Sequence, residues 1–377
     1  MQPLIQKKLT LLLPSLRVGG AEKVLVALAN YFSARMSYVE LVVREGGPLE
    51  EELDPRVALH VLSASNYRTY IMQLSVYFDT YRPDYLITSI YITGICALIA
   101  RLLAKYKPRI LVGAHNLFSA KVASPDNIKD KYLLAPLARM FLPLADAIVC
   151  VSHGVAEDLL RHANVQSAKL HVIYNPVIPL ELERLKCEPL SHEWLESDRS
   201  EATIVTVCRL VPQKGVDTLL RAFALITSVD TKLIIIGDGP ERDSLKRLVS
   251  ELQIESRVDF IGLERNPFKY LARCDLFVMS SRWEGFGNTL AEALACGCPV
   301  VATDCQSGPA EILENGALGR LVPVDNPDRL AESICDALCE ERNDVEKLRR
   351  IHRAQMFSLD SAGARYFEVL QSMDIVN

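Results

Sequence analysis

The alternation of short apolar runs with helical stretches constrains the fold of this chain more than any other feature. Residues 9–152 contain five runs that predict buried strands: LTLLLPS, YVELVVR, DYLITS, RILVGAHN and AIVCVS. Between them, stretches such as KVLVALANYFSAR and GICALIARLLAKY repeat their apolar residues at helical spacing. Strands that alternate with helices in this way predict a parallel sheet with helices on its faces.

The alternation stops once and then begins again. Residues 175–200 carry several prolines and many charges without an apolar run, which is typical of a linker. Beyond them, six further runs predict a second set of strands: TIVTVCR, KLIIIGDG, RVDFIG, LFVMSS, PVVAT and GRLVPV. A chain of 377 residues is long enough for two domains of roughly 150 residues each.

We therefore predict an α/β fold of two Rossmann-like, doubly wound domains that face a central cleft. The expected boundaries are 1–180 for the N-terminal domain, 181–200 for the linker, 201–355 for the C-terminal domain and 356–377 for a C-terminal helix that packs back on the N-terminal domain. In sheets of this kind, ligands bind at the carboxyl ends of the strands. The loops at those ends are where we expect the functional residues.

The bulk composition favours a soluble protein. Hydrophobic residues make up 49% of the chain and charged residues 24%, and the net charge of −5 argues against a general affinity for nucleic acid. The ten cysteines lack the paired spacing of a zinc site or a disulfide framework, which favours reduced thiols and a cytoplasmic location. The longest uncharged run, residues 85–100, is shorter than the ~18–20 apolar residues of a membrane-spanning helix.

Two glutamates stand eight residues apart in the segment RWEGFGNTLAEALACGCPVVA, which follows a predicted strand. Glu284 lies in the loop beside a Gly-Phe-Gly turn, and Glu292 lies one turn into a helix that we expect to begin near Asn288, an N-cap residue type. Because a carboxylate accepts two hydrogen bonds, either acid could bind adjacent hydroxyls of a sugar. The alternative for Glu292 is a first-turn acid that only complements the helix dipole.

The turn between the two acids suits a phosphate. Gly285 and Gly287 allow the backbone to turn tightly and to expose its amides. The free N–H groups at the N-terminus of the following helix would serve the same anion.

Two cations follow the first strand of the second half, in the segment CRLVPQKGVDTLL. Arg209 ends that strand, and Lys214 comes five residues later, immediately before Gly215 and a helix. Two positive charges at a strand-to-helix turn suit a diphosphate. The alternative is a pair of solvated surface charges.

A further glycine turn, in LIIIGDGPERDSL, matches the dinucleotide-binding loop of dehydrogenases only in part. Arg242 occupies the position where that loop requires its third glycine, which disfavours a nicotinamide dehydrogenase. We expect Gly237 to line the ligand site instead.

The N-terminal half offers two candidate features. Gly19 and Gly20 lie between the first predicted strand and the first helix, where a phosphate or an acceptor could approach the backbone. The alternative for them is an ordinary tight turn. His115 stands at the carboxyl end of a predicted strand and could orient or polarise a substrate, although a lone histidine is more often structural.

One absence bears on the chemistry, because no D-x-D sequence occurs in the chain. Enzymes that hold a nucleotide diphosphate through a divalent metal commonly use such paired carboxylates. We therefore expect metal-independent chemistry without a cofactor, in which Arg209, Lys214 and helix N-termini supply the positive field.

These motifs together resemble glycosyltransferase family 4, whose members have the GT-B fold. The E-x7-E pattern around Gly-Phe-Gly and the earlier R-x4-K-G pattern are accompanied by GGAEKVL, VSHGVAEDL, IIGDGPERDSL and DFIGLERNPFKYLARCDLF. The resemblance covers nearly the whole chain. It implies a transferase that retains the anomeric configuration, in which a same-face attack is assisted by the departing phosphate.

The resemblance also implies roles for the candidate residues. Arg209 and Lys214 would hold the diphosphate and stabilise the charge that builds on it. Glu292 would hold the ribose hydroxyls, Glu284 would contact the transferred sugar, and the base would lie against the backbone near Leu263. The other donor-binding residues are then Gly19, Gly20, Gly237, Gly285, Phe286, Gly287, Asn288 and Thr289. His115 would join Arg209, Lys214 and Glu284 as a catalytic group that faces the donor phosphate and the acceptor.

The acceptor implied by the resemblance is an undecaprenyl-diphosphate-linked saccharide, as in bacterial enzymes that add hexoses or amino sugars during surface polysaccharide or glycoprotein assembly. Residues 101–143 carry eight Lys/Arg against two acids, near the apolar stretch YLLAPLARMFLPL. A face of this kind could rest on the anionic inner surface of a membrane. The candidate acceptor or membrane contacts are Lys121, Lys129, Lys131 and Arg139. The alternative is a solvated helix face.

The donor nucleotide and the reaction class keep alternatives. UDP is favoured as the donor nucleotide, with GDP-mannose as the alternative. A nucleotide-sugar epimerase of the same fold and a non-catalytic nucleotide-sugar sensor are rival classes. The joint presence of Arg209, Lys214, Glu284 and Glu292 argues against the sensor.

Overall fold

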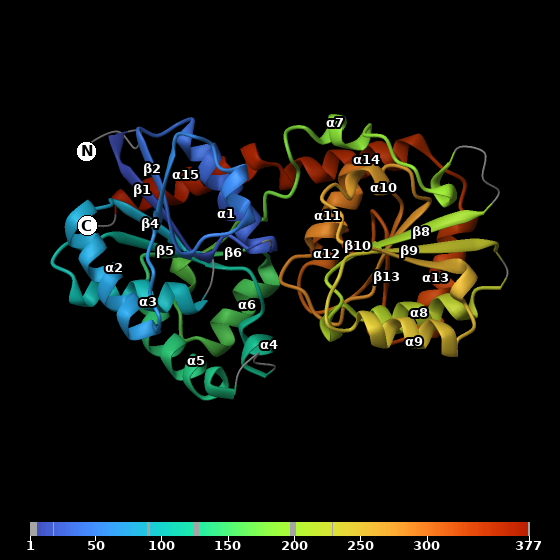
Figure 1. Cartoon of the computed structure of the whole chain (residues 1–377), viewed down its shortest axis with the longest axis horizontal. Coiled ribbons are helices and arrows are strands. Elements are labelled where there is room, and N and C mark those ends of the chain that lie inside the picture. Colours follow the sequence, from blue (N-terminus) through green and yellow to red (C-terminus); the bar gives the residue numbers. More distant parts are fainter. Residues whose placement is uncertain are drawn as a thin grey trace. The chain divides into compact units, whose positions relative to one another are not determined.

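The chain folds into two compact units, which are described separately (Figure 1). The computed structural model describes residues 6–17, 19–88, 91–123, 128–196, 201–227 and 229–375, without the side chains of residues 128–131 and 375. The first unit consists of residues 1–176 together with 359–377, and the second of residues 177–358.

The first unit contains a seven-stranded sheet in the order β3-β2-β1-β4-β5-β6-β7, and every neighbouring pair is parallel. Its strands are β1 (Lys8–Ser15), β2 (Tyr38–Glu45), β3 (Val57–Val61), β4 (Tyr85–Thr88), β5 (Arg109–Ala114), β6 (Ala147–Cys150) and β7 (Leu170–Val172). Its α-helices are α1 (Gly20–Ser33), α2 (Tyr67–Tyr81), α3 (Tyr91–Leu103), α4 (Phe118–Ala123), α5 (Ile128–Phe141), α6 (His153–His162) and α15 (Leu359–Ile375). Short 3-10 turns are η2 (Pro48–Glu52), η3 (Leu142–Leu144) and η4 (Ser167–Lys169).

Alternating side chains of the strands divide the core of the first unit between the two faces of the sheet. Leu9, Leu11 and Leu13 of β1 lie in one buried cluster with residues of α1 and α15. Helix α15 packs so closely on α1 that a Cβ placed on Gly363 would lie 2.3 Å from the Tyr31 ring. The last helix of the chain is therefore part of the core of the first unit.

The second unit repeats the arrangement with a six-stranded parallel sheet in the order β10-β9-β8-β11-β12-β13. Its strands are β8 (Ala202–Val207), β9 (Thr231–Ile236), β10 (Val258–Gly262), β11 (Leu276–Met279), β12 (Val300–Thr303) and β13 (Arg320–Val322). Its α-helices are α7 (Leu182–Lys186), α8 (Val216–Leu225), α9 (Arg242–Glu251), α10 (Phe268–Leu271), α11 (Asn288–Ala295), α12 (Pro309–Ile312), α13 (Pro327–Cys339) and α14 (Asp344–Ala354). Its 3-10 turns are η5 (Glu193–Leu195), η6 (Pro212–Lys214), η7 (Glu255–Arg257) and η8 (Gln355–Phe357).

The order of the second sheet determines where its loops meet. The chain runs outward from β8 to β10, returns to the other side of β8 and continues from β11 to β13. This reversal creates a switch point between β8 and β11, where the loops at the carboxyl ends diverge and leave room for a ligand. The R-x4-K segment follows β8 and the E-x7-E segment follows β11, so the two predicted motifs lie on adjacent strands. The predicted doubly wound α/β fold is confirmed.

The segment 181–200 differs from the linker that the sequence predicts. Its described part contains α7 and η5 and packs on the second unit. The Nδ2 atom of Asn266, a buried side chain, donates to the Leu185 carbonyl at 2.8 Å. His192 lies 3.2 Å from Asp259, and Trp194 accepts a hydrogen bond from Thr203 at 2.5 Å. Hydrogen bonds of this kind, and not an apolar run, therefore hold the described part of this segment on the second unit.

Candidate active site

Lys214 and Glu284 contact each other at the switch point of the second sheet. Lys214 ends η6, seven residues beyond the last residue of β8, and Glu284 lies in the loop after β11. The Nζ atom of Lys214 lies 2.5 Å from Oε1 of Glu284, and the Ser281 hydroxyl donates to the same oxygen at 2.7 Å. Two candidate groups from separate motifs are thus brought together.

Burial and charge act in opposite directions on this pair. Burial lowers the pKa of Lys214, but the charge and hydrogen bond of Glu284, together with the thiols of Cys208 and Cys305, outweigh it, so that the pKa is raised and the ammonium is favoured. The Glu284 side chain is 8% exposed and that of Lys214 is 22% exposed. Both contacts to Glu284 go to Oε1, and Oε2 accepts no hydrogen bond from the residues that the structure describes. One carboxylate oxygen therefore remains for a substrate.

Arg209 has a different environment from Lys214. Its side chain is exposed, and it makes no ion pair or side-chain hydrogen bond within the described part of the chain. A guanidinium without an internal partner, five residues before the partly exposed ammonium of Lys214, can bind a second anionic group of the same ligand.

Glycines permit close approaches between the loops around this pair. Gly215 has a φ of +58°, and a Cβ placed on it would lie 2.2 Å from the Ser280 carbonyl oxygen. Gly237, at the end of β9, has a φ of +135°, and its Cβ would lie 1.8 Å from the Cys208 carbonyl oxygen. Larger residues would separate these loops, which have to lie at contact distance to present their amides and charges together.

The loop between the two glutamates is held from outside. Ser307 donates to the Gly285 carbonyl at 2.9 Å, and a Cβ on Gly308 would lie 1.9 Å from the Phe286 carbonyl oxygen. Phe286 is buried and its ring packs against Phe357 at 5.2 Å between centroids. The loop therefore has little freedom to move.

Helix α11 begins at Asn288, as predicted, but its N-cap is Gly287. Gly287 has a φ of +104°, a left-handed conformation that favours glycine over the asparagine that the sequence suggested as a cap. Thr289 is the second residue of the helix and is partly exposed. The first turn of α11 carries no acid, so no carboxylate in that turn would repel an anion bound at the helix N-terminus.

The other two predicted donor contacts lie on separate elements. Glu292 is half-buried on α11, one turn beyond Asn288, and its charge contributes to the raised pKa of the Cys296 thiol, which is chiefly due to burial. Leu263 follows β10 and is 84% exposed. An exposed leucine at a carboxyl end is an apolar surface against which a base could lie.

In the first unit, Gly19 is the N-cap of α1 and Gly20 its first residue. The φ of Gly19 is −155°, which any residue adopts, and a Cβ there would lie 2.2 Å from a carboxylate oxygen of Glu22. Burial raises the pKa of Glu22, although a hydrogen bond that its carboxylate accepts from its own backbone amide opposes the shift. An acid, which the sequence analysis did not select, therefore lies where a phosphate was expected.

His115 lies at the carboxyl end of β5, as predicted, next to the last strand residue. Both ring nitrogens are enclosed and have no hydrogen-bond partner of good geometry among the described residues. Burial lowers the pKa of His115 to about 4, and the side chain of Asn175 offsets part of that shift. The ring is therefore neutral at physiological pH, with two polar atoms that a ligand or a water could use.

The four cations predicted to contact the acceptor or a membrane lie in different surroundings, and only two of their side chains are described. Lys121 lies in the last turn of α4. Arg139 donates to the His162 carbonyl at 2.9 Å, at the C-terminal end of α6, so part of its charge serves the fold. The side chains of Lys129 and Lys131, in α5, lie outside the described residues.

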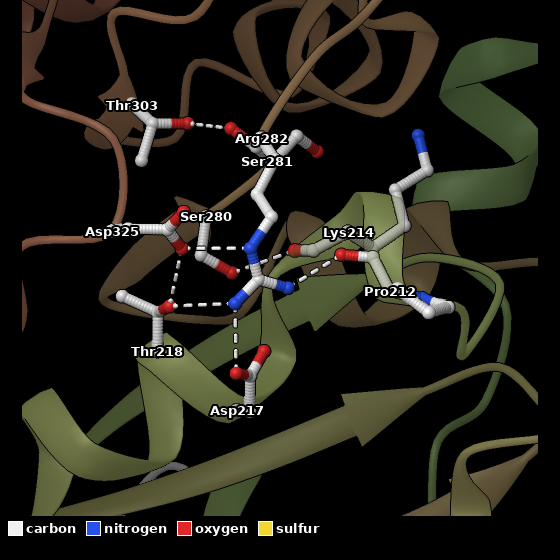
Figure 2. A network of polar contacts seen from close by, with 9 residues as sticks. All are labelled: Pro212, Lys214, Asp217, Thr218, Ser280, Ser281, Arg282, Thr303 and Asp325. Carbon is white, nitrogen blue, oxygen red and sulfur yellow. Dashed lines mark hydrogen bonds and ion pairs between the residues drawn. The ribbon is translucent and has the colours of Figure 1, made fainter. Parts of the chain in front are cut away.

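Arg282 is the most connected residue near the pair, and the sequence analysis did not identify it (Figure 2). It contacts Asp217, Asp325 and the η6 backbone. The only local signal is that it stands two residues before Glu284, because all of these partners are distant in the sequence.

The described residues contain no group of three or more His, Cys, Asp or Glu side chains arranged to hold a metal ion. Within the same part of the chain, no helix combines the length and the apolar character that crossing a bilayer requires. An exposed guanidinium, a partly exposed ammonium and a carboxylate with one unbonded oxygen, all on loops at one switch point, suit a ligand that carries a diphosphate and hydroxyls.

Two Rossmann-like units of this kind are the architecture of the GT-B fold. Among solved structures, Anabaena HepE in complex with UDP matches 97% of this chain and 100% of its own, with a TM-score of 0.79 and 22% identity. The family model described as Glycosyltransferase Family 4 matches residues 18–179, and the model described as Glycosyl transferases group 1 matches residues 190–355. The chain belongs to glycosyltransferase family 4.

Curated relatives agree with that assignment. One is the N-acetylgalactosamine-N,N'-diacetylbacillosaminyl-diphospho-undecaprenol 4-alpha-N-acetylgalactosaminyltransferase of Campylobacter jejuni, which is 29% identical over 92% of this chain and 93% of its own length. Another is the N-acetyl-alpha-D-glucosaminyl L-malate synthase of Bacillus anthracis, which is 30% identical over 68% of this chain and 66% of its own length. The chain is thus a glycosyltransferase similar to enzymes of bacterial glycan assembly.

Proposed function

We propose that this chain transfers a hexose or N-acetylhexosamine from a UDP-sugar to a lipid-linked saccharide, with retention of anomeric configuration. The observation that carries the proposal is the contact of Lys214 with Glu284 beside the exposed Arg209. Support for UDP comes from the Anabaena relative in fold, whose structure contains UDP. Support for the acceptor comes from the Campylobacter relative, whose name specifies a diphospho-undecaprenol saccharide.

The chemistry divides among these groups. Arg209 and Lys214 bind the diphosphate and stabilise the charge that builds on it as the glycosidic bond breaks. The free Oε2 of Glu284 accepts hydrogen bonds from the transferred sugar, and Glu292 accepts them from the ribose. His115, in the first unit, is neutral at physiological pH, so a catalytic role for it would rest on hydrogen bonds rather than on charge. The departing phosphate receives the proton of the attacking hydroxyl on the same face, so no further acid or base is required.

A donor panel tests the proposal directly. UDP-glucose, UDP-galactose, UDP-N-acetylglucosamine, UDP-N-acetylgalactosamine and GDP-mannose are each offered with a synthetic polyprenyl-diphosphate disaccharide, and glycosylated product is measured by mass spectrometry. Transfer from a UDP-sugar with an α-linkage is expected. Transfer from GDP-mannose alone would replace UDP by the mannosyltransferase alternative.

The same panel without acceptor tests the epimerase alternative. An epimerase converts the nucleotide sugar when no acceptor is present, whereas a transferase leaves it intact apart from slow hydrolysis. Accumulation of an epimeric UDP-sugar in the acceptor-free arm would therefore reject the transferase.

We also propose that transfer needs no divalent metal or other cofactor, because cations of the chain can neutralise the diphosphate. Transfer in excess EDTA tests this, with Mg²⁺ and Mn²⁺ added back separately. Activity within about two-fold of the metal-supplemented rate is expected, since a charge that Lys214 and Arg209 supply is not removed by a chelator.

A cytoplasmic location with peripheral membrane contact through the first unit completes the proposal. Helix α5 packs on α3 and exposes Tyr132 (72%), Leu133 (56%) and Met140 (64%). Exposed apolar side chains beside cations suit an anionic bilayer surface.

Vesicle co-sedimentation tests the membrane contact. Binding is expected to phosphatidylglycerol vesicles, weaker to phosphatidylcholine vesicles, and reduced in Tyr132→Ser/Leu133→Ser. The matched control is Met72→Ser/Val76→Ser, which removes two side chains of α2 that are 57% and 64% exposed. Equal binding by both double variants would reject α5 as the contact.

A further inference from the structure

The guanidinium of Arg282 joins three segments of the second unit that are distant in sequence (Figure 2). Its Nε donates to Oδ1 of Asp325 at 2.7 Å, and its Nη2 donates to Oδ2 of Asp217 at 2.8 Å. Its Nη1 donates to the Pro212 carbonyl in η6 at 2.6 Å. Each nitrogen of the fork has an acceptor, so the group has one preferred position.

The backbone on either side of this fork is paired as well. The Arg282 amide donates to the Gln213 carbonyl at 2.7 Å, and the Gln213 side chain donates to the Trp283 carbonyl at 2.8 Å. The Ser280 hydroxyl donates to the Lys214 carbonyl at 2.9 Å. Several hydrogen bonds therefore hold residues 212–214 against residues 280–283. Figure 2 shows that the Lys214 side chain points away from the Arg282 guanidinium.

The charges around Arg282 differ from those around Arg209. Two carboxylates, those of Asp217 and Asp325, face the Arg282 guanidinium, and Thr218 donates to Asp325 at 3.1 Å. Arg282 is 23% exposed and its charge is compensated, whereas Arg209 is exposed with no such partner among the described residues. A compensated cation is poorly suited to bind a phosphate and well suited to fix the backbone that carries one.

We propose that Arg282 is a positioning residue for the transfer reaction, which holds η6 against the loop after β11 so that Lys214 stays at Glu284. Arg282 stands two residues before Glu284, and its acceptor Pro212 stands two residues before Lys214. The fork therefore sets the spacing between the diphosphate-binding cation and the sugar-binding carboxylate. This inference rests on the proposed function, which gives those two groups their roles.

Arginine suits this task better than lysine, because the three acceptors lie at three different nitrogens of the planar guanidinium, whereas lysine has all its N–H donors on a single nitrogen. Arg282→Lys is therefore the informative variant. Arg320→Lys is the matched control, because Arg320 also bridges two acids, Asp336 and Glu340, in the same unit but far from η6 in the sequence. Asp325→Asn removes one of the two negative charges that face Arg282 and leaves Arg282 in place, which provides a milder test if Arg282→Lys folds poorly.

Calorimetric titration with UDP gives the first readout. The dissociation constant for UDP is expected to rise by about 10- to 100-fold in Arg282→Lys, as for the loss of one or two charge-assisted hydrogen bonds. The Asp325→Asn variant is expected to lie between wild type and Arg282→Lys. The Arg320→Lys variant is expected to bind UDP as wild type does. Equal weakening by Arg282→Lys and Arg320→Lys would overturn the inference, because both would then act through general stability.

A double variant separates positioning from direct contact. If Arg282 acts through Lys214, adding Arg282→Lys to Lys214→Ala weakens UDP binding by less than about two-fold further. Multiplicative losses would mean that Arg282 contributes independently of Lys214, and the inference would be wrong.

Hydrogen exchange of the ligand-free protein tests the fork without any substrate. Amides of residues 210–216 are expected to exchange faster in Arg282→Lys than in wild type or Arg320→Lys. Unchanged exchange would overturn the inference even if UDP binding fell. If wild type bound no nucleotide, the proposed function would fail, whereas the exchange result would still decide whether Arg282 holds η6.

Discussion

The ammonium of Lys214 lies 2.5 Å from a carboxylate oxygen of Glu284, across a separation of 70 residues in the sequence. The groups proposed to bind the diphosphate and the transferred sugar of the donor therefore neutralise each other before a donor binds. A donor diphosphate would have to share Lys214 with Glu284, which keeps the cation in place and spares the site an isolated buried charge.

Removing either member of this pair should cost more stability than removing both. In Lys214→Met, the buried Glu284 carboxylate (6% exposed) keeps only its hydrogen bond from the Ser281 hydroxyl. We therefore expect the free energy of unfolding to fall by about 1–3 kcal/mol. Adding Glu284→Gln should restore part of it, with a coupling energy of about 1–3 kcal/mol in a double-mutant cycle measured by urea denaturation. Additive losses would show that the contact contributes nothing to folding.

Either single variant should also lower turnover, by at least about 100-fold.

The alkaline limit of stability depends on the same contact. Because the pKa of Lys214 is raised above 10.5, its stabilising effect is complete below the ordinary lysine pKa and is lost as pH rises through the folded value. The difference in melting temperature between wild type and Lys214→Met should therefore stay constant from pH 7 to about pH 10 and shrink above that. In Glu284→Gln, which removes the main cause of the upward shift, burial should instead lower the pKa of Lys214, so stability should no longer fall as that lysine titrates.

His115 should make the first unit less stable as pH falls, whereas Lys214 makes the second unit less stable as pH rises. Its pKa is lowered from 6.5 to about 4, so the unfolded chain takes up the proton first as pH falls. The neutral ring therefore stabilises the fold above pH 6.5, and at most about 3 kcal/mol of that is lost on acidification towards pH 4. His115→Asn lacks this titration. The difference in unfolding free energy between the two proteins should depend on pH in that window, and a flat difference would contradict the burial of the ring.

Gly215 should tolerate no side chain. Gly215→Ala places a Cβ 2.2 Å from the Ser280 oxygen at a φ of +58°, which should destabilise the second unit by about 1–3 kcal/mol and weaken UDP binding. Gly316→Ala is the matched control, because Gly316 has a φ of +95° but its Cβ would meet only the Gly319 oxygen, at 3.6 Å. Calorimetry should show the larger loss for Gly215→Ala, and equal losses would assign the effect to backbone conformation alone.

Gly363 tests the last helix in the same way. Gly363→Ala drives a methyl group into the Tyr31 ring, 2.3 Å from its Cε1 atom, and should cost the first unit about 1–3 kcal/mol. Tyr31→Leu in the same chain should recover part of that loss by making room. UDP affinity should not change in either variant, because the proposed nucleotide site lies on the other unit.

The alternation of apolar runs was sufficient to predict two doubly wound sheets, because central strands buried on both faces are nearly continuous in Val, Ile and Leu. The edge strands β3 and β7 were missed. Only the first residue of β3 is buried and the other four are partly or fully exposed, all three residues of β7 are partly exposed, and a histidine interrupts the apolar residues of each strand. The sequence predicts a linker for residues 181–200 for a related reason: polar hydrogen bonds, and not an apolar run, hold the described part of this segment on the second unit.

The candidate site was predictable up to the level of single loops. Glycine turns and charged residues directly after apolar runs placed Arg209, Lys214 and Glu284 at carboxyl ends of strands. Their pairing was not predictable, because the contact of Lys214 with Glu284 depends on which strands are neighbours. Arg282 was missed for the same reason, since its carboxylate partners come from two other segments, Asp217 from the first turn of α8 and Asp325 from the loop after β13.

The placement of α15 in the first core also determines the order in which the chain can mature on the ribosome. Buried residues of that core, including Tyr366 and Leu370, are synthesised only after the whole second unit. Because domains generally fold as they emerge, the second unit can complete its sheet while the first still lacks one wall. The half of the chain that is translated first is thus the half that finishes folding last.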